Sequence, residues 1–96
     1  FKRLLRLVIR GKNEKKVIND INKLSEKFKN IKNNNIQILG PAPCLITKIN
    51  NNYRYQILLK SKNIKLLQET VKNAILNLNV NNKNFLEIDV DPVDLF

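Results

Sequence analysis

The residues of this 96-residue sequence best placed for chemistry are cations that alternate with other residues in two short runs. Arg6 and Arg10 share one parity of the first run, and Arg54 and Lys60 share one parity of a later run. Such alternation predicts β-strands, in which successive side chains point to opposite faces of a sheet. Cations gathered on one face can bind phosphate or carboxylate groups, and arginine does so through forked hydrogen bonds. The candidate anion contacts are Arg54, Lys60, Lys48 and Arg10.

The same face carries its own carboxylates, which give the arginines a second interpretation. Glu87 and Asp89 have the matching parity in the last apolar run. Cross-strand ion pairs between these acids and Arg6 or Arg10 are the favoured interpretation of that cluster. For Arg54 and Lys60, a phosphate contact and a purely structural role are about equally supported.

The remaining reactive residues point to no catalysis. The acidic tail (Glu87, Asp89, Asp91 and Asp94) has no histidine or third convergent ligand beside it, so a strand-end turn is favoured over a metal or acid–base site. The single cysteine, Cys44, excludes an internal disulfide and a multi-cysteine zinc site. Without a neighbouring base it is best interpreted as a small packed thiol. We expect no catalytic residue and no metal site in this chain.

Composition favours one small domain with an anionic partner. Apolar residues make up 43%, enough for a core, and the net charge of +10 comes from 18 Lys and Arg against 8 Asp and Glu. An AT-rich genome explains much of the lysine, because Asn, Ile and Lys number 17, 12 and 14. The chain starts at Phe1 and contains no Met, so we expect residues 1–96 to be one domain excised from a larger protein. The lone cysteine and the lack of a membrane-spanning apolar run favour the cytoplasm and no membrane partner.

Six elements are expected along the chain. Apolar residues spaced by three and four predict helices, and alternation predicts strands. Asn13 and Asn63 are the expected helix N-caps. The expected elements are strand Phe1–Arg10, helix Lys12 to about Ile31, strand Ile36–Leu39 broken at Gly40–Pro43, strand Cys44–Ile49, a turn at Asn50–Asn52, strand Tyr53–Lys60, helix Asn63 to about Leu78, and strand Phe85–Val90. Asn-rich loops are expected at Asn33–Asn35 and Asn79–Asn84, and no internal sequence repeat is evident.

The order βαββαβ predicts an α+β, ferredoxin-like split βαβ sandwich. Each helix has one apolar stripe, so both must cover the same face of a four-stranded antiparallel sheet, with the first and third strands central. Tyr53 and Tyr55 have the parity of the helix-covered face, and we interpret both mainly as core residues with their hydroxyls at the rim. The sheet therefore lacks the aromatic platform on which RNA-recognition domains stack bases.

Three segments resemble the end of the PriA family of replication-restart helicases (primosomal protein N-prime). They are the Gly-Pro-x-Pro bend at Gly40–Pro43, the aromatic-Arg-aromatic-Gln strand at Tyr53–Lys60, and Ile88–Pro92, which reads Ile-Asp-Val-Asp-Pro. The resemblance implies the C-terminal DNA-binding and docking module of an ATP-dependent 3′ to 5′ DNA helicase that acts at forks in replication restart and primosome assembly. It implies DNA (forked or single-stranded), the helicase core of the same chain and other primosome proteins as partners. ATP, magnesium and zinc are expected in the parent protein and none in this chain.

The resemblance also implies a docking surface on the second helix. Gln68 matches a glutamine in a region of the family implicated in binding the acidic tail of the single-stranded DNA-binding protein, whereas Ile64 stands where an arginine is expected. Lys62 or Lys65 could supply the cation, and Leu76 lies on the polar helix face, suited to contact the helicase core. Two alternatives stay open: a ribosomal or other RNA-binding protein of the same fold, and a small acyl phosphatase-like enzyme.

Overall fold

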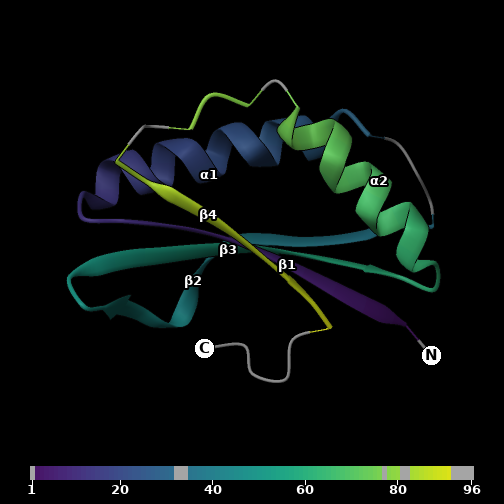
Figure 1. Cartoon of the computed structure of the whole chain (residues 1–96), viewed down its shortest axis with the longest axis horizontal. Coiled ribbons are helices and arrows are strands. Elements are labelled where there is room, and N and C mark those ends of the chain that lie inside the picture. The colour runs from purple at the N-terminus through teal and green to yellow at the C-terminus, as the bar shows by residue number, and fades with distance from the viewer. Residues whose placement is uncertain (1, 32–34, 77, 81–82, 92–96) are drawn as a thin grey trace.

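A computed structural model of the chain describes residues 2–31, 35–76, 78–80 and 83–91. Its elements are β1 (Arg3–Gly11), α1 (Glu14–Lys29), β2 (Gln37–Ile49), β3 (Asn52–Ser61), α2 (Ile64–Ile75) and β4 (Phe85–Val90). The strands form one antiparallel sheet in the order β2-β3-β1-β4, and both helices lie on the same side of it (Figure 1). The expected ferredoxin-like arrangement, with the first and third strands central, is confirmed.

Both helices begin at the expected caps. The side chain of Asn13 accepts a hydrogen bond from the Lys16 backbone N–H (3.1 Å), and Asn63 does the same for Leu66 (3.2 Å). Each helix ends slightly before its apolar pattern does. The last helical residues are Lys29 and Ile75, and Asn30 and Leu76 are the C-caps. Ile31 and Leu78 still pack against the core from beyond the helix ends.

The core lies between the helices and the sheet. Leu5, Leu7 and Ile9 of β1 are fully buried, and so are Ile57 and Leu59 of β3. The helices cover them with the stripes expected from the sequence, which contribute Val17, Ile21, Leu24 and Phe28 from α1 and Leu67, Val71 and Ala74 from α2. Packing of this layer fixes which strand faces are left for function.

The edge strand β2 corrects one expectation. It is a single strand with two bulges, not two strands separated by a break. Three residue steps from Leu39 to Ala42 lie opposite two on β3, and five from Pro43 to Lys48 lie opposite two. The first bulge contains Gly40, whose φ of +99° suits glycine, followed by the cis peptide to Pro41. We expected an edge position because proline lacks the N–H that a ladder requires, and β2 does lie at the edge of the sheet.

The β2–β3 hairpin closes as expected, through Asn50 and Asn51. Their φ values of 51° and 64° give the turn that matches the twist of a two-residue hairpin. Asn52 is the first residue of β3 and pairs with Ile49.

The sheet face away from the helices is less open than its parity predicts. Cys44, in the second bulge of β2, folds over this face, and its thiol approaches the Gln56 side-chain oxygen (3.8 Å). Val8 and Cys44 are fully buried there, and Arg6 is only 7% exposed. Figure 1 shows the end of β2 on the opposite side of the sheet from α1 and α2.

Several expectations concern residues outside the described part of the chain. These are Asn33–Asn34 and Asn81–Asn82 of the two Asn-rich loops, together with Pro92 and Asp94 of the terminal segment. Among the residues that the structure describes, no helix is both long and apolar enough to cross a membrane.

Candidate nucleic-acid interface

The arginines of β1 are occupied by ion pairs with β4. The Arg6 guanidinium donates to Asp89 (2.8 and 3.2 Å), and Arg10 Nε donates to Glu87 (2.5 Å). Their strands pair so that Arg6 lies opposite Asp89, as the favoured interpretation required. This cluster therefore neutralises itself, and Arg6 is too buried to reach an external phosphate.

Arg54 and Lys48 are also engaged within the chain. Arg54 donates to the backbone oxygen of Ile46 (3.1 Å), which holds the second bulge of β2 against the sheet. The ammonium of Lys48 lies 5.0 Å from the centre of the Tyr53 ring. Lys60 stands six residues further along β3 than Arg54, or about 20 Å away at the rise of a strand. The structure thus separates Lys60 from the other candidates, whereas Arg10 lies directly opposite Arg54 on the ladder and lines the same small pocket, and Lys48 pairs with the neighbouring Tyr53.

The two tyrosines, which were expected on the helix-covered face, differ in how they pack. Tyr55 packs against the core, and its hydroxyl donates to Glu14 at the start of α1 (2.9 Å), which raises the pKa of that phenol. Tyr53 is half-buried beneath Lys48 and is not part of the core cluster, so its interpretation as a core residue was wrong.

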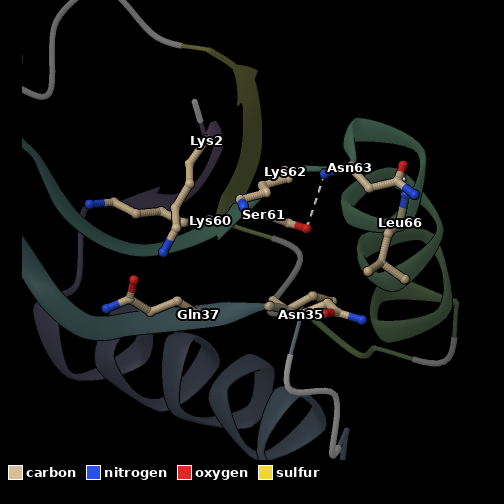
Figure 2. A pocket seen from close by; sticks show the side chains of 9 residues that line it. Lys2, Asn35, Gln37, Lys60, Ser61, Lys62, Asn63 and Leu66 are labelled. Carbon is tan, nitrogen blue, oxygen red and sulfur yellow. Dashed lines mark hydrogen bonds between the residues drawn. The ribbon is translucent and has the colours of Figure 1, made fainter.

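Lys60 lies in a pocket of about 440 Å³ at the end of β3, which we call the lysine pocket. Figure 2 shows Lys2, Lys60 and Gln37 on one side of it, with Lys62 and Asn63 leading into α2. The ladder brings them together, because Lys60 pairs with Gln37 on one side and with Leu4 on the other. The sequence analysis missed Lys2, although it shares the parity of Arg6.

The lysine pocket gathers positive charge that no acid among its described lining residues balances. Its lining contains three lysines (Lys2, Lys60 and Lys62) and no acidic residue. In the described ranges, none of the three ammonium groups forms a hydrogen bond or an ion pair. The first turn of α2 likewise carries no acid. A site of this kind attracts an anion without having to displace an internal partner.

A second basic pocket, of about 690 Å³, lies at the opposite end of the sheet, and we call it the Phe85 pocket. Lys12, Lys16 and Lys83 line it together with Phe85, which is 55% exposed. The guanidinium carbon of Arg10 lies 4.6 Å from the centre of the Phe85 ring. Phe85 was not among the expected site residues, although it shares the outward parity of Glu87 and Asp89.

A buried contact holds the Phe85 pocket in place. The Asn84 amide donates to the Asp20 carboxylate (2.6 Å), and both side chains are buried. Gly11 lies against them so closely that a Cβ there would come within 2.0 Å of the Asn84 side-chain oxygen. Glycine at this point lets the start of β4 approach the end of β1. Helical spacing could have marked Asp20 as buried, because it lies three residues after Val17 and four before Leu24, beside the apolar stripe.

The expected docking residues divide between two surfaces. Gln68 lines a groove of about 270 Å³ between α2 and β4, with Lys72, Ile75, Ile88 and Val90. Lys65 and Leu76 are exposed, Leu76 by 72%, but neither lines this groove. The groove therefore pairs Gln68 with Lys72, one turn later, and not with Lys65.

The acidic tail and Cys44 have structural partners. Asp91 accepts from Arg3 Nε (2.6 Å) and from the Leu4 backbone N–H (3.0 Å), and both contacts hold its pKa below its ordinary value. Burial raises the pKa of the Cys44 thiol, as suits a packed residue. Within the described ranges, no group of three or more Cys, Asp or Glu side chains gathers in the way a metal ion requires.

Comparison with known proteins places the chain in a family. A family model described as the primosomal protein N C-terminal domain (PriA_C) matches residues 1–93. The chain belongs to this family. Similar relatives are the replication restart proteins PriA of Borreliella burgdorferi (32% identical over 95 residues), Treponema pallidum (27% over 95 residues) and Chlamydia trachomatis (25% over 96 residues). The match takes in 99–100% of this chain and only 13–14% of each PriA protein.

The fold of this PriA C-terminal domain also occurs outside the family. A de novo designed protein, Foldit4, superposes with a TM-score of 0.70 at 14% sequence identity, covering 98% of this chain and all of the designed one. At that identity the likeness shows the ferredoxin-like fold alone. Function must come from the sites described above.

Proposed function

We propose that this chain is the C-terminal DNA-binding and docking module of a PriA-type replication restart helicase. The observation that carries the DNA-binding part is the lysine pocket, with Lys2, Lys60 and Lys62 converging where no acid balances them. Ammonium groups in such a pocket bind phosphates and release the counterions condensed on DNA. Contacts of this kind position a nucleic acid without reading its bases.

The proposal assigns no catalysis to these residues. We propose that ATP, magnesium and zinc serve other parts of the parent protein, which acts in the cytoplasm as a 3′ to 5′ helicase at forks. The role of the C-terminal module is then to add phosphate contacts and to pack on the helicase core, to which exposed Leu76 is suited.

The test compares two double variants with equal loss of charge. Lys60→Ala/Lys62→Ala removes two cations of the lysine pocket, and Lys27→Ala/Lys29→Ala removes two from the end of α1. Fluorescence anisotropy with labelled single-stranded and forked DNA is recorded across a salt series. We expect the first variant to bind roughly 5- to 30-fold more weakly at low salt.

The salt dependence gives the decisive readout. The slope of log affinity against log salt should fall by about 1.4 for single strands in Lys60→Ala/Lys62→Ala, at about 0.7 per lost phosphate contact. The Lys27→Ala/Lys29→Ala control should keep most of the affinity and slope. Equal losses in the two variants would show only a general charge effect and would remove the lysine pocket from the interface.

RNA binding is the alternative with the same fold, and substrate preference separates the two. We expect the chain to prefer forked or single-stranded DNA over single-stranded RNA of the same sequence. A reversed preference would favour an RNA-binding role.

For docking, we propose that the groove between α2 and β4 receives an acidic peptide such as the tail of a single-stranded DNA-binding protein. Lys72 supplies a cation, Gln68 a polar contact, and Ile88 and Val90 an apolar floor. Isothermal titration with the tail peptide should show binding that Gln68→Ala and Lys72→Ala each weaken. Absence of heat with the unmodified chain would retire this groove as the docking site.

A further inference from the structure

The Phe85 pocket combines an exposed aromatic ring with cations. Phe85 lies at the start of an edge strand, and Lys12, Lys16 and Lys83 line the same hollow. At 55% exposure, Phe85 leaves much of its ring accessible to a ligand. Exposed aromatic rings beside cations are the usual means of holding single-stranded nucleic acid, in which bases stack on rings while cations track phosphates.

The charges around the ring favour an anionic ligand. Among the described residues that line the pocket, none is acidic. The nearby carboxylates already have partners: Glu87 binds Arg10, Asp20 is buried beneath Asn84, and Glu14 accepts from Tyr55. Arg10 contacts the ring through its guanidinium. This cation–π contact orients the ring, and 55% of Phe85 remains accessible.

The ring is held in advance of binding. Asn84 directly precedes Phe85 and is fixed by its hydrogen bond to buried Asp20 and by contact with Gly11. On the ladder, Phe85 lies opposite Arg10. A rigid ring loses little entropy when a base stacks on it.

We infer that Phe85 is a base-stacking site for single-stranded nucleic acid, with Lys12, Lys16 and Lys83 holding the adjoining phosphates. This inference rests on the proposed DNA-binding function and adds a contact of a different kind, at the other end of the sheet. The lysine pocket binds phosphates alone, whereas the Phe85 pocket requires a base.

The first test uses an intact oligothymidylate and an abasic oligonucleotide of equal length and charge. Phe85→Leu keeps an apolar side chain and removes the ring. We expect it to bind the intact strand about 5- to 100-fold more weakly and the abasic strand as well as the unmodified chain does. Leu45→Ala, a change at an exposed apolar residue of the other edge strand, should alter neither. Circular dichroism checks that each variant is folded.

The second test follows stacking at position 85 directly, by fluorescence. The chain contains no Trp, so Phe85→Trp introduces the sole indole. The intact strand should quench its fluorescence with unchanged or higher affinity, and the abasic strand should bind without comparable quenching. Equal affinity of Phe85→Leu and the unmodified chain for the intact strand, or no quenching of Phe85→Trp, would overturn the stacking site while leaving the proposed function standing. No binding of either strand by the unmodified chain would overturn both.

Discussion

The two ends of the sheet share a Lys-Asn junction between strand and helix and differ in what surrounds it. At one end β1 runs into α1 through Gly11-Lys12-Asn13, and at the other β3 runs into α2 through Ser61-Lys62-Asn63. The two capping asparagines have nearly equal dihedral angles, φ −107° and ψ 111° for Asn13 and φ −110° and ψ 107° for Asn63. Only the Lys-Asn pair is identical in the two junctions, which is too little to make an internal sequence repeat.

Strand order explains why the ends differ. Because β4 lies beside β1, its first residue, Phe85, emerges next to the end of β1. The end of β3 instead lies between the starts of β1 and β2, which bring Lys2 and Gln37. Strand order, and not the local junction, therefore decides which end carries an aromatic ring and which carries cations alone.

The largest expected effect comes from crowding the Phe85 end. Gly11→Ala places a Cβ within 2.0 Å of the Asn84 oxygen, so Asn84 must shift away from Asp20. We expect a loss of about 1–3 kcal/mol in the free energy of unfolding, measured by urea denaturation. The equivalent change at the other end, Ser61→Ala, loses only a hydrogen bond from the Asn63 N–H, about 1 kcal/mol. A smaller loss for Gly11→Ala than for Ser61→Ala would contradict the close packing at Gly11.

Removing the Asp20 carboxylate should lower the free energy of unfolding by an amount similar to, or slightly smaller than, the loss in Gly11→Ala. Asp20→Ala leaves the Asn84 amide buried without its carboxylate, which costs about 1–3 kcal/mol. Because Asn84 fixes Phe85, the variant should also lose preference for intact over abasic strands, as followed by anisotropy. Full retention of that preference would show that Asp20 does not position the ring.

Arg54→Ala separates a structural arginine from a DNA contact. Its hydrogen bond to the Ile46 oxygen ties down the second bulge of β2, so we expect about 1 kcal/mol lower stability. DNA affinity should change less than in Lys60→Ala/Lys62→Ala. An affinity loss as large as in that double variant would return Arg54 to the interface.

Replacing one lysine of the lysine pocket, Lys2, should weaken DNA binding and leave the stability of the fold unchanged. Lys2 is exposed, so Lys2→Ala should leave thermal stability unchanged. The salt slope for single-stranded DNA should fall by about 0.7, as one phosphate contact is lost. An unchanged slope would exclude Lys2 from the lysine pocket's contacts.

The smallest expected effect is a pH-dependent one at the end of β4. The pKa of Asp91 is lowered chiefly by its hydrogen bond from Arg3, so its ionised form stabilises the fold above its ordinary pKa of 3.8. That stability is lost as the pH falls through the lowered pKa. Asp91→Asn should therefore slightly lower the melting temperature at pH 7 and lower it less at pH 2. Equal differences at both pH values would contradict the ionic contribution.

The sequence predicted the fold well because each element carries its own periodic signal. The apolar stripes predicted both helices, and the asparagine caps predicted where they start. The parity of Arg6 in its strand predicted the ion pair with Asp89. The family resemblance was confirmed by the match over residues 1–93. The bulges of β2 were missed, because proline signals irregularity without telling how many residues leave the ladder.

The candidate site was predicted only in part, since it depends on distances across strands. Arg54 and Lys60 share a face in the sequence pattern, yet they stand about 20 Å apart along β3. Lys2 and Phe85 join their pockets through strand pairing with distant residues, which no local pattern reveals. Sequence reasoning located the charged face and could not tell which cations have partners.

The contrast between the two ends is tested most directly by the ratio of affinities for intact and abasic single strands. This ratio is measured by anisotropy in the unmodified chain, in Lys60→Ala/Lys62→Ala and in Phe85→Leu. We predict that the lysine variant binds both strands more weakly with the ratio unchanged, while Phe85→Leu brings the ratio close to one. A ratio that Phe85→Leu leaves intact, or that the lysine variant abolishes, would contradict the division of phosphate and base contacts between the two ends.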